Sequence, residues 1–196
     1  MKIKLQLLII LIFIITTLIF FKTSKKEVIY ITSDIDGKNY LVRDLKDKQK
    51  AANMLARIYK NIMLLVDHLN TNKDDKYSEY KKYIDQLTNK IKNVIINESS
   101  DDGMYTSYSV NKGEQIVFCL RSKKYKNKLH DLNLLMYVTL HEIAHVATPE
   151  YGHTPLFKKI FAFLTKVAID IGLYNKINFE SIPLEYCGLM ISDSIV

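Results

Sequence analysis

Apolar residues recur every three or four positions in two stretches of the chain, and this spacing predicts two amphipathic helices. The first covers residues 45–69 and the second residues 77–96, and the polar run at 70–75 breaks the pattern between them. The face of the second helix opposite its apolar residues is rich in lysine, which is typical of a solvated surface. Each helix is therefore expected to pack one face against a core.

Two further stretches are apolar over most of their length and predict core helices. Residues 131–147 form the first, which ends before Pro149 because the residue preceding a proline disfavours helical backbone angles. The second begins at Pro155, where the hydroxyl of Thr154 can cap the first turn, and it runs to Gly172. We expect these two helices to pack against each other.

Apolar runs bounded by turn residues predict two hairpins. Residues 28–43 read as two short strands joined at Asp36-Gly37, and residues 105–121 as two strands joined at 111–113. The last strand, residues 116–120, is apolar without interruption, so we expect both of its faces to be buried. Helices and hairpins together predict one α+β domain over residues 28–196.

The N-terminal segment predicts a membrane anchor. Residues 5–21 are almost entirely apolar, and their length lies at the lower end of the roughly 17–25 residues that span a bilayer. No pattern of small residues follows, so an uncleaved single-pass helix in the lipid bilayer is favoured over a cleaved signal peptide. Lysines lie on both sides of the segment, and the orientation in the membrane is therefore not predicted.

The charge of the chain gives little reason to expect a nucleic-acid partner. There are 28 Lys and Arg against 21 Asp and Glu, which gives a net charge of +7. Lys2, Lys4 and Lys22 flank the apolar segment, and without these three the remainder carries 25 basic against 21 acidic groups, or +4. So mild an excess does not predict binding to nucleic acid.

The cysteines suggest no redox or metal motif. Cys119 and Cys187 are the two in the chain, and their wide separation makes neither a zinc knuckle nor a CxxC pair. We favour two buried, reduced thiols. A single disulfide is the alternative, and it would suit an oxidising compartment.

The motif His141-Glu142-Ile143-Ala144-His145 lies on the third predicted helix. Residues four apart are neighbours on one helix face, so both imidazoles can bind one ion, with nitrogen atoms about 2.0–2.1 Å from zinc. Glu142 lies too far round the helix to be a ligand, but its carboxylate can reach a water beside the metal. Zinc lowers the pKa of such a water towards 7, and Glu142 takes the proton as a general base.

Zinc in a catalytic site needs a third protein ligand and one open position. We favour His153, because the chain can turn at residues 149–152 and bring this side chain back just before the next helix. Glu180 and Glu185 are the alternative third ligands. The two remaining histidines are expected to be surface or capping residues: His68 and His130.

At these residues the chain resembles the SprT/WLM group of zinc metallopeptidases, also described as minimal gluzincins. That group carries HExxH, a third histidine, and an aromatic residue on the next helix, matched here by residues 141–145, His153 and Phe157. The chain is also similar to WLM-domain proteins of large DNA viruses over residues 105–191, through SYSVNKGEQIVFCLR and IPLEYCGLMI. It departs from SprT members in that Gly152 precedes the third histidine.

The resemblance implies a helix-rich, zincin-like fold with a short sheet beside the motif helix. It implies Zn²⁺ bound by His141, His145 and His153, and hydrolysis of peptide bonds with Glu142 as the base. An anchor at 1–26, a hairpin with two amphipathic helices at 27–100 and a metallopeptidase core at 101–196 are the expected segments.

We therefore predict a membrane-anchored zinc metallopeptidase whose partner is a peptide or protein substrate. One alternative is a catalytically silent protein of a membrane or virion, stabilised by zinc. The other is a DNA–protein crosslink protease, although no further cysteine cluster and no DNA-binding tail follow the motif.

Two features of the reaction remain to be assigned to residues. An extended peptide is expected to add beside an exposed strand of the 105–121 hairpin. The oxyanion formed during hydrolysis needs a donor besides the metal, and Tyr151 and Tyr108 are the candidates.

Overall fold

The structure is a computed structural model that describes residues 6, 12–16, 27–101, 106–125 and 127–196. Beyond residue 27 it contains four α-helices: α2 (Lys48–Asn72), α3 (Lys81–Ile91), α4 (Leu132–Ala147) and α5 (Pro155–Asp170). A 3-10 turn, η1 (Ser78–Tyr80), precedes α3. The strands are β1 (Val28–Thr32), β2 (Asn39–Arg43), β3 (Ile95–Glu98), β4 (Ser107–Val110), β5 (Gln115–Phe118), β6 (Leu184–Tyr186) and β7 (Leu189–Ile191).

The strands form a three-stranded sheet and two separate hairpins. In the sheet, β5 lies between β3, to which it is parallel, and β4, to which it is antiparallel. All five residues at 116–120 are buried, which confirms the burial predicted for this run. The hairpin predicted at 28–43 is also confirmed, because β1 and β2 pair antiparallel from Val28–Arg43 to Thr32–Asn39.

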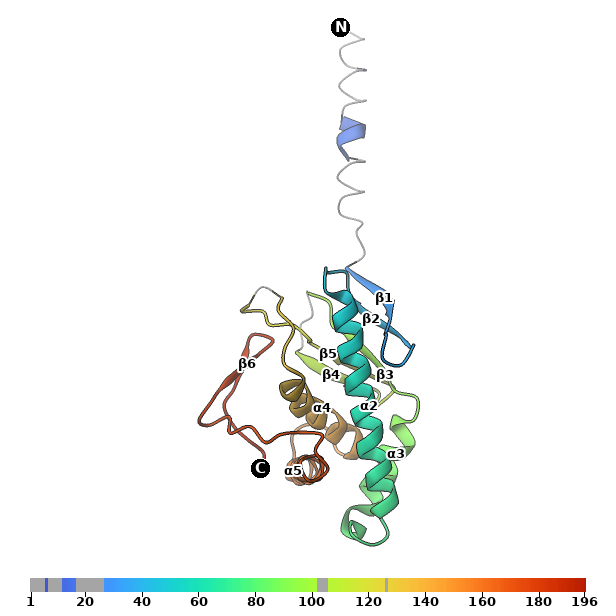
Figure 1. Cartoon of the computed structure of the whole chain (residues 1–196), viewed down its shortest axis with the longest axis vertical. Coiled ribbons are helices and arrows are strands. Elements are labelled where there is room, and N and C mark those ends of the chain that lie inside the picture. Colours follow the sequence, from blue (N-terminus) through green and yellow to red (C-terminus); the bar gives the residue numbers. More distant parts are fainter. Residues whose placement is uncertain (1–5, 7–11, 17–26, 102–105, 126) are drawn as a thin grey trace.

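Helix α4 is the central element of the fold. It contacts α2, α3, α5 and strand β4, and most of its residues are buried. Contact on so many sides explains why its sequence is apolar nearly all round rather than on one stripe. In Figure 1, α2 lies on one side of α4 and the β6–β7 hairpin on the other. The core includes buried residues from Tyr40 in β2 to Cys187 after β6.

The C-terminal end predicted for the helix at 77–96 is wrong. Helix α3 stops at Ile91, and residues 95–98, whose first two were predicted to be helical, form strand β3. The β-branched run Val94-Ile95-Ile96 favours an extended backbone, and pairing with the buried strand β5 gives that run a place in the sheet. Helical periodicity alone did not reveal this long-range partner.

The membrane anchor predicted at residues 5–21 is wrong, and so is the single-pass membrane localisation that rested on it. Of this segment the structure describes residue 6 and residues 12–16, and the remainder lies outside the described residues. Within the described part of the chain, no helix combines the length and the apolar character needed to cross a bilayer. The longest, α2, is amphipathic, with one face buried and charged residues on the other.

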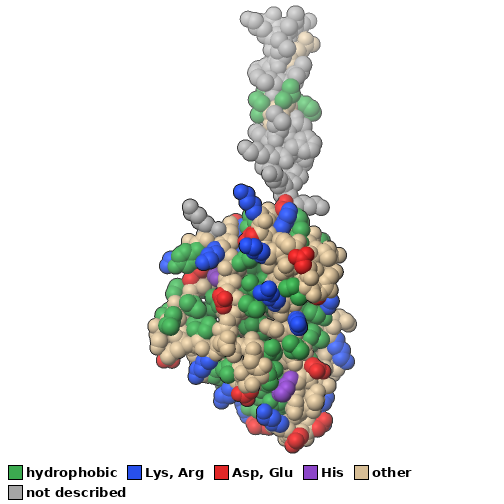
Figure 2. All heavy atoms as spheres, viewed as in Figure 1, with side chains coloured by type: hydrophobic (Ala, Val, Ile, Leu, Met, Phe, Trp, Pro, Cys, Tyr) green, Lys and Arg blue, Asp and Glu red, His purple; other side chains and the backbone are tan. Residues whose placement is uncertain are grey.

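The cysteines are paired, contrary to the expectation of two reduced thiols. Cys119, directly after β5, and Cys187, directly after β6, form a disulfide with their Cα atoms 6.1 Å apart. Sequence spacing gave no sign of this pairing, since the chain must pass through α4 and α5 before the second cysteine returns to the sheet. On the face shown in Figure 2, basic and acidic side chains are interspersed.

Candidate metal centre

Two of the three predicted ligands lie one turn apart on α4. Asp131 caps the start of this helix by accepting a hydrogen bond from the backbone N–H of Asn133 at 2.8 Å. The Nε2 atoms of His141 and His145 are 3.2 Å apart. The helix therefore brings two imidazole nitrogens to one point, as the i, i+4 spacing predicts.

The third histidine reaches the same point from the start of α5. Gly152, with φ +80°, turns the chain back, and the hydroxyl of Thr154 accepts from the backbone N–H of Phe157 to begin the helix. The Nε2 atom of His153 lies 3.0 Å from that of His141. His141, His145 and His153 are thus brought together, with ligand atoms all within 4.8 Å of one another.

The geometry of the cluster fits a tetrahedral metal ion. With nitrogen–zinc distances of about 2.0–2.1 Å, two tetrahedral ligands lie roughly 3.3–3.4 Å apart. The separations of 3.2 Å and 3.0 Å from His141 to its two neighbours are close to that value. Glu180 is exposed and Glu185 bonds to Ser122, and neither belongs to the histidine cluster.

The electrostatics of the cluster also suit a cation. Burial lowers the pKa of His141 to about 3 and that of His145 to about 4, and the neighbouring histidines add to both shifts. At neutral pH these imidazoles are uncharged, so their nitrogen lone pairs are available to a metal. The ring of Phe157 stacks on His145 with centroids 4.1 Å apart and meets His141 edge-on, which fixes both rings.

Glu142 lies beside the histidines as a buried acid. Its side chain is 5% exposed, and burial raises the pKa of its carboxyl to about 7. It faces the same cleft as the three histidines, a hollow of about 650 Å³. A carboxylate in so dry a place has a raised proton affinity, which suits a group that takes up and returns a proton.

Strand β4 forms one margin of this cleft. It is the edge of the three-stranded sheet, and within the described residues no strand pairs with its outer side. The backbone N–H of Cys119 donates to the carbonyl of Thr106, so by alternation Ser107 and Ser109 turn their backbone groups outward. An extended chain laid along this edge could pair with the outward-facing backbone groups of Ser107 and Ser109.

Lys112, which the sequence analysis did not single out, holds the turn that carries His153. It lies in the β4–β5 turn with φ +53°, a conformation uncommon for a side-chain-bearing residue. Its Nζ donates to the carbonyls of Thr148, Pro149 and Glu150 at 2.6–2.8 Å. These carbonyls lie between the end of α4 and the third histidine, so one ammonium ties the two ligand-bearing elements together.

Replacing Lys112 by Met is expected to loosen this loop. Hydrogen bonds from a charged donor contribute roughly 1.5–3 kcal/mol where they are well buried. Because Lys112 is partly exposed, we expect a total loss of about 1–3 kcal/mol of unfolding free energy and a weaker zinc affinity. Thermal melting and zinc titration measure the two effects. Lys166→Met, an exposed lysine on α5, is the matched control, and equal behaviour of the two variants would contradict the prediction.

Of the other two histidines, His130 differs from the surface or capping position expected of it. His130 is buried, and its Nε2 accepts from the backbone N–H of Cys187 at 3.3 Å. His68 is partly buried, with its Nε2 3.2 Å from the hydroxyl of Tyr77. Neither belongs to the cluster of three histidines, and both make hydrogen bonds that support packing.

The two tyrosines considered as oxyanion donors both line the cleft, but they do so from exposed positions. Tyr151 is 84% exposed and Tyr108 is 38% exposed. Two further tyrosines, Tyr186 and Tyr137, line the cleft from buried positions, at 4% and 8% exposure. No local signal in the sequence marks Tyr186, because it contacts Ser107 across 79 positions of the chain.

The chain is similar in sequence to proteins of several viruses. Uncharacterized protein 136R of Invertebrate iridescent virus 6 is 45% identical over 71 residues, which cover 36% of this chain and 39% of that protein. Uncharacterized protein 042R of Invertebrate iridescent virus 3 is 44% identical over 86 residues, covering 42% and 50%. No protein-family model matches the chain.

The chain is also similar to one solved structure and to a protein of a mimivirus. The crystal structure of Wss1 from Saccharomyces cerevisiae aligns with 52% of this chain and 84% of its own, at 22% identity and a TM-score of 0.35. Uncharacterized protein R325 of Acanthamoeba polyphaga mimivirus is 50% identical over 184 residues, which cover 93% of this chain and 92% of that protein. The chain therefore belongs to the family of mimivirus protein R325.

Proposed function

We propose that this protein is a zinc-dependent metallopeptidase that hydrolyses peptide bonds with Glu142 as the general base. One observation carries the proposal: three imidazoles suited to one cation and the buried carboxylate of Glu142 face the same open cleft. A zinc site that serves stability alone is usually closed by four protein ligands. In the described part of the chain this cluster has three, which leaves a position for chemistry.

The roles of the residues follow from their chemistry. His141, His145 and His153 would hold the ion. Bound there, zinc supplies Lewis acidity, which polarises the scissile carbonyl and lowers the pKa of water. Glu142 accepts a proton from the attacking water and delivers it to the leaving amine, so one carboxyl acts as base and then as acid. The outer edge of β4 would hold the substrate as an added strand beside these groups.

The apolar lining of the cleft supports a substrate with large hydrophobic side chains. Val138, Phe161, Leu189 and Ile191 all face the hollow. Side chains that fill such surfaces gain about 25 cal/mol for each Å² of apolar area removed from water. We therefore expect cleavage to favour bonds next to an apolar residue.

The proposal is tested by incubating the zinc-loaded protein with a mixed peptide library. Mass spectrometry of the products is expected to show new termini next to apolar residues. Chelation should abolish cleavage, and stoichiometric zinc should restore it. If protein that binds one zinc per chain cleaves no peptide of the library, the peptidase assignment is contradicted. In that case, a melting temperature that still rises with zinc would favour a protein that the metal only stabilises.

A further inference from the structure

The C-terminal hairpin contributes a buried hydroxyl to the cleft. Tyr186, at the end of β6, lines the hollow together with Leu189 and Ile191 from β7. Its side chain is 4% exposed, so the phenol lies in a site largely free of bulk water. Hydrogen-bond donors held in such surroundings act far more strongly on a developing charge than exposed ones.

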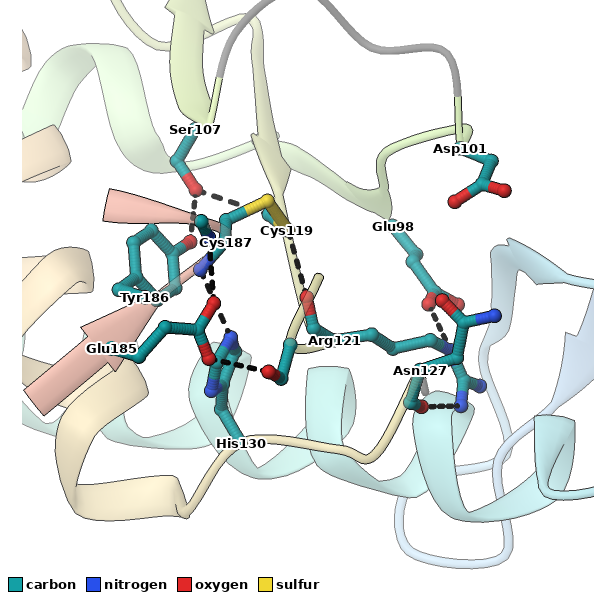
Figure 3. The surroundings of a disulfide bond; sticks show 12 residues. Glu98, Asp101, Ser107, Cys119, Arg121, Asn127, His130, Glu185, Tyr186 and Cys187 are labelled. Carbon is teal, nitrogen blue, oxygen red and sulfur yellow. Dashed lines mark hydrogen bonds and ion pairs between the residues drawn. A yellow bond between two sulfur atoms is a disulfide. The ribbon is translucent and has the colours of Figure 1, made fainter. Parts of the chain in front are cut away.

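The hydrogen bonds around Tyr186 allow its hydroxyl to act as a donor, because either oxygen of the Ser107–Tyr186 pair can supply the proton of their shared bond. Figure 3 shows its hydroxyl bonded to the Oγ atom of Ser107, which lies on strand β4. The backbone N–H of Cys119, which donates to the carbonyl of Thr106 at 3.0 Å, also donates to the same Oγ atom at 3.2 Å. Since the N–H can only donate, Ser107 accepts there and can direct its own hydrogen to the oxygen of Tyr186. The phenol hydrogen is then available to an acceptor in the cleft.

Covalent and polar contacts fix the phenol in place. The next residue, Cys187, is bonded to Cys119, so the hairpin is fastened to the end of β5 (Figure 3). The backbone N–H of Cys187 also donates to His130, whose ring lies 5.1 Å from that of Tyr186. Glu185 accepts from Ser122 and from the backbone N–H of Gly188. A donor held on so many sides needs no reorganisation when charge develops.

Tyr186 also lies within electrostatic range of the proposed base. Burial raises the pKa of its phenol, and the charge of Glu142 raises it further. Tyr186 therefore keeps its proton at neutral pH, and it lines the same cleft as Glu142. The two exposed tyrosines at the cleft, Tyr108 and Tyr151, lack such burial.

We propose that Tyr186 is a catalytic residue of this site, and that it donates a hydrogen bond to the oxyanion that develops on the substrate carbonyl. The Cys119–Cys187 disulfide positions it for this role. The inference rests on the peptidase function proposed above. It replaces Tyr151 and Tyr108, the donors suggested by the sequence, with a residue that the fold brings in from the C-terminal hairpin.

Tyr186→Phe tests the proposal, because it removes one hydroxyl and keeps the ring. In the zinc-loaded protein we expect kcat to fall about 10²–10³-fold with little change in KM, and zinc content to stay at one per chain. The affinity for an N-phosphoryl-leucyl dipeptide, whose tetrahedral phosphoryl group imitates the oxyanion, should fall about 10- to 100-fold. Tyr30→Phe, on the exposed strand β1, is the matched control and should change neither quantity.

The phosphoryl probe separates this inference from the peptidase function. Its binding needs no turnover, so it decides the role of Tyr186 even if wild-type protein cleaves nothing. Equal affinity of wild type and Tyr186→Phe for the probe would overturn the inference, as would failure of both to bind it with zinc present. If the Phe variant does not fold, Ser107→Ala takes its place, and an unchanged affinity in that variant counts against Tyr186.

The disulfide is tested with the double variant Cys119→Ser/Cys187→Ser. We expect it to retain zinc and to lose probe affinity in the same direction as Tyr186→Phe, because the hairpin is no longer fastened to β5. If the folded double variant binds the phosphoryl probe as tightly as wild type, the disulfide does not position Tyr186.

Discussion

Replacing Glu142 by Gln is expected to reduce peptide hydrolysis by about 10²–10⁴-fold, the range typical of a lost general base. The amide of Gln has nearly the same shape as the carboxyl but cannot take a proton from water. Glu142 is not one of the clustered ligands, so the histidines should bind zinc as before. The variant should also fold as well as wild type, because a neutral amide costs less to bury than a charge. Rates on a peptide identified from the library, together with elemental analysis, measure these effects.

Glu180→Gln is the matched control for this experiment. Glu180 is an exposed carboxylate outside the cluster, so its loss should change neither the rate nor the zinc content. If Glu142→Gln retained the wild-type rate, general-base catalysis by this residue would be excluded. If it lost zinc instead, the carboxyl would have to be a ligand, contrary to the observed cluster of three histidines.

Replacing His153 by Ala is expected to remove most of the metal affinity. Outer-shell partners of metal ligands are worth about 10–100-fold in affinity, and a direct ligand is expected to be worth more. Zinc at about 100 times its dissociation constant stabilises the folded protein by roughly 2.7 kcal/mol. For a chain of this size we expect a rise in melting temperature of about 5–10 °C in wild type and a much smaller rise in the variant.

The exposed position of His153 lets the His153→Ala variant report on metal binding without a change in core packing. Its side chain is exposed, so the substitution opens no cavity in the core. His68→Ala, a partly buried histidine that contacts Tyr77, is the matched control and should keep the full zinc-dependent rise. A rise in His153→Ala equal to that of wild type would show that the third imidazole does not bind the metal.

Much of the region around the histidine cluster could be predicted from the sequence because the signals there are local. The i, i+4 spacing of His141 and His145 depends only on helix geometry, and α4 supplies that helix. Thr154 and Pro155 mark the start of α5, which fixes where His153 can lie. Burial of the run at 116–120 followed from its uninterrupted apolar residues.

What the sequence did not reveal depends on contacts between distant segments. Strand β3 forms because β5 lies beside it. In the sequence, the first residues of β3 continue the helical spacing of apolar residues in α3. Lys112 reaches the ligand loop across 36–38 positions of the chain, and Tyr186 meets Ser107 across 79. The apolar character of residues 5–21 indicated a membrane span, but composition within a window does not establish a spanning helix.

The bond between Cys119 and Cys187 has a consequence for the denatured protein. It closes a loop across a separation of 68 residues, and His141, His145, His153 and Tyr186 all belong to that loop. Chain-entropy arguments give such a closure roughly 4 kcal/mol of stabilisation through the unfolded state. A proteolytic nick within the loop would leave the two fragments covalently tethered, so a nicked chain could still bring the three histidines together. Electrophoresis with and without reductant would distinguish this tethered form from separated pieces.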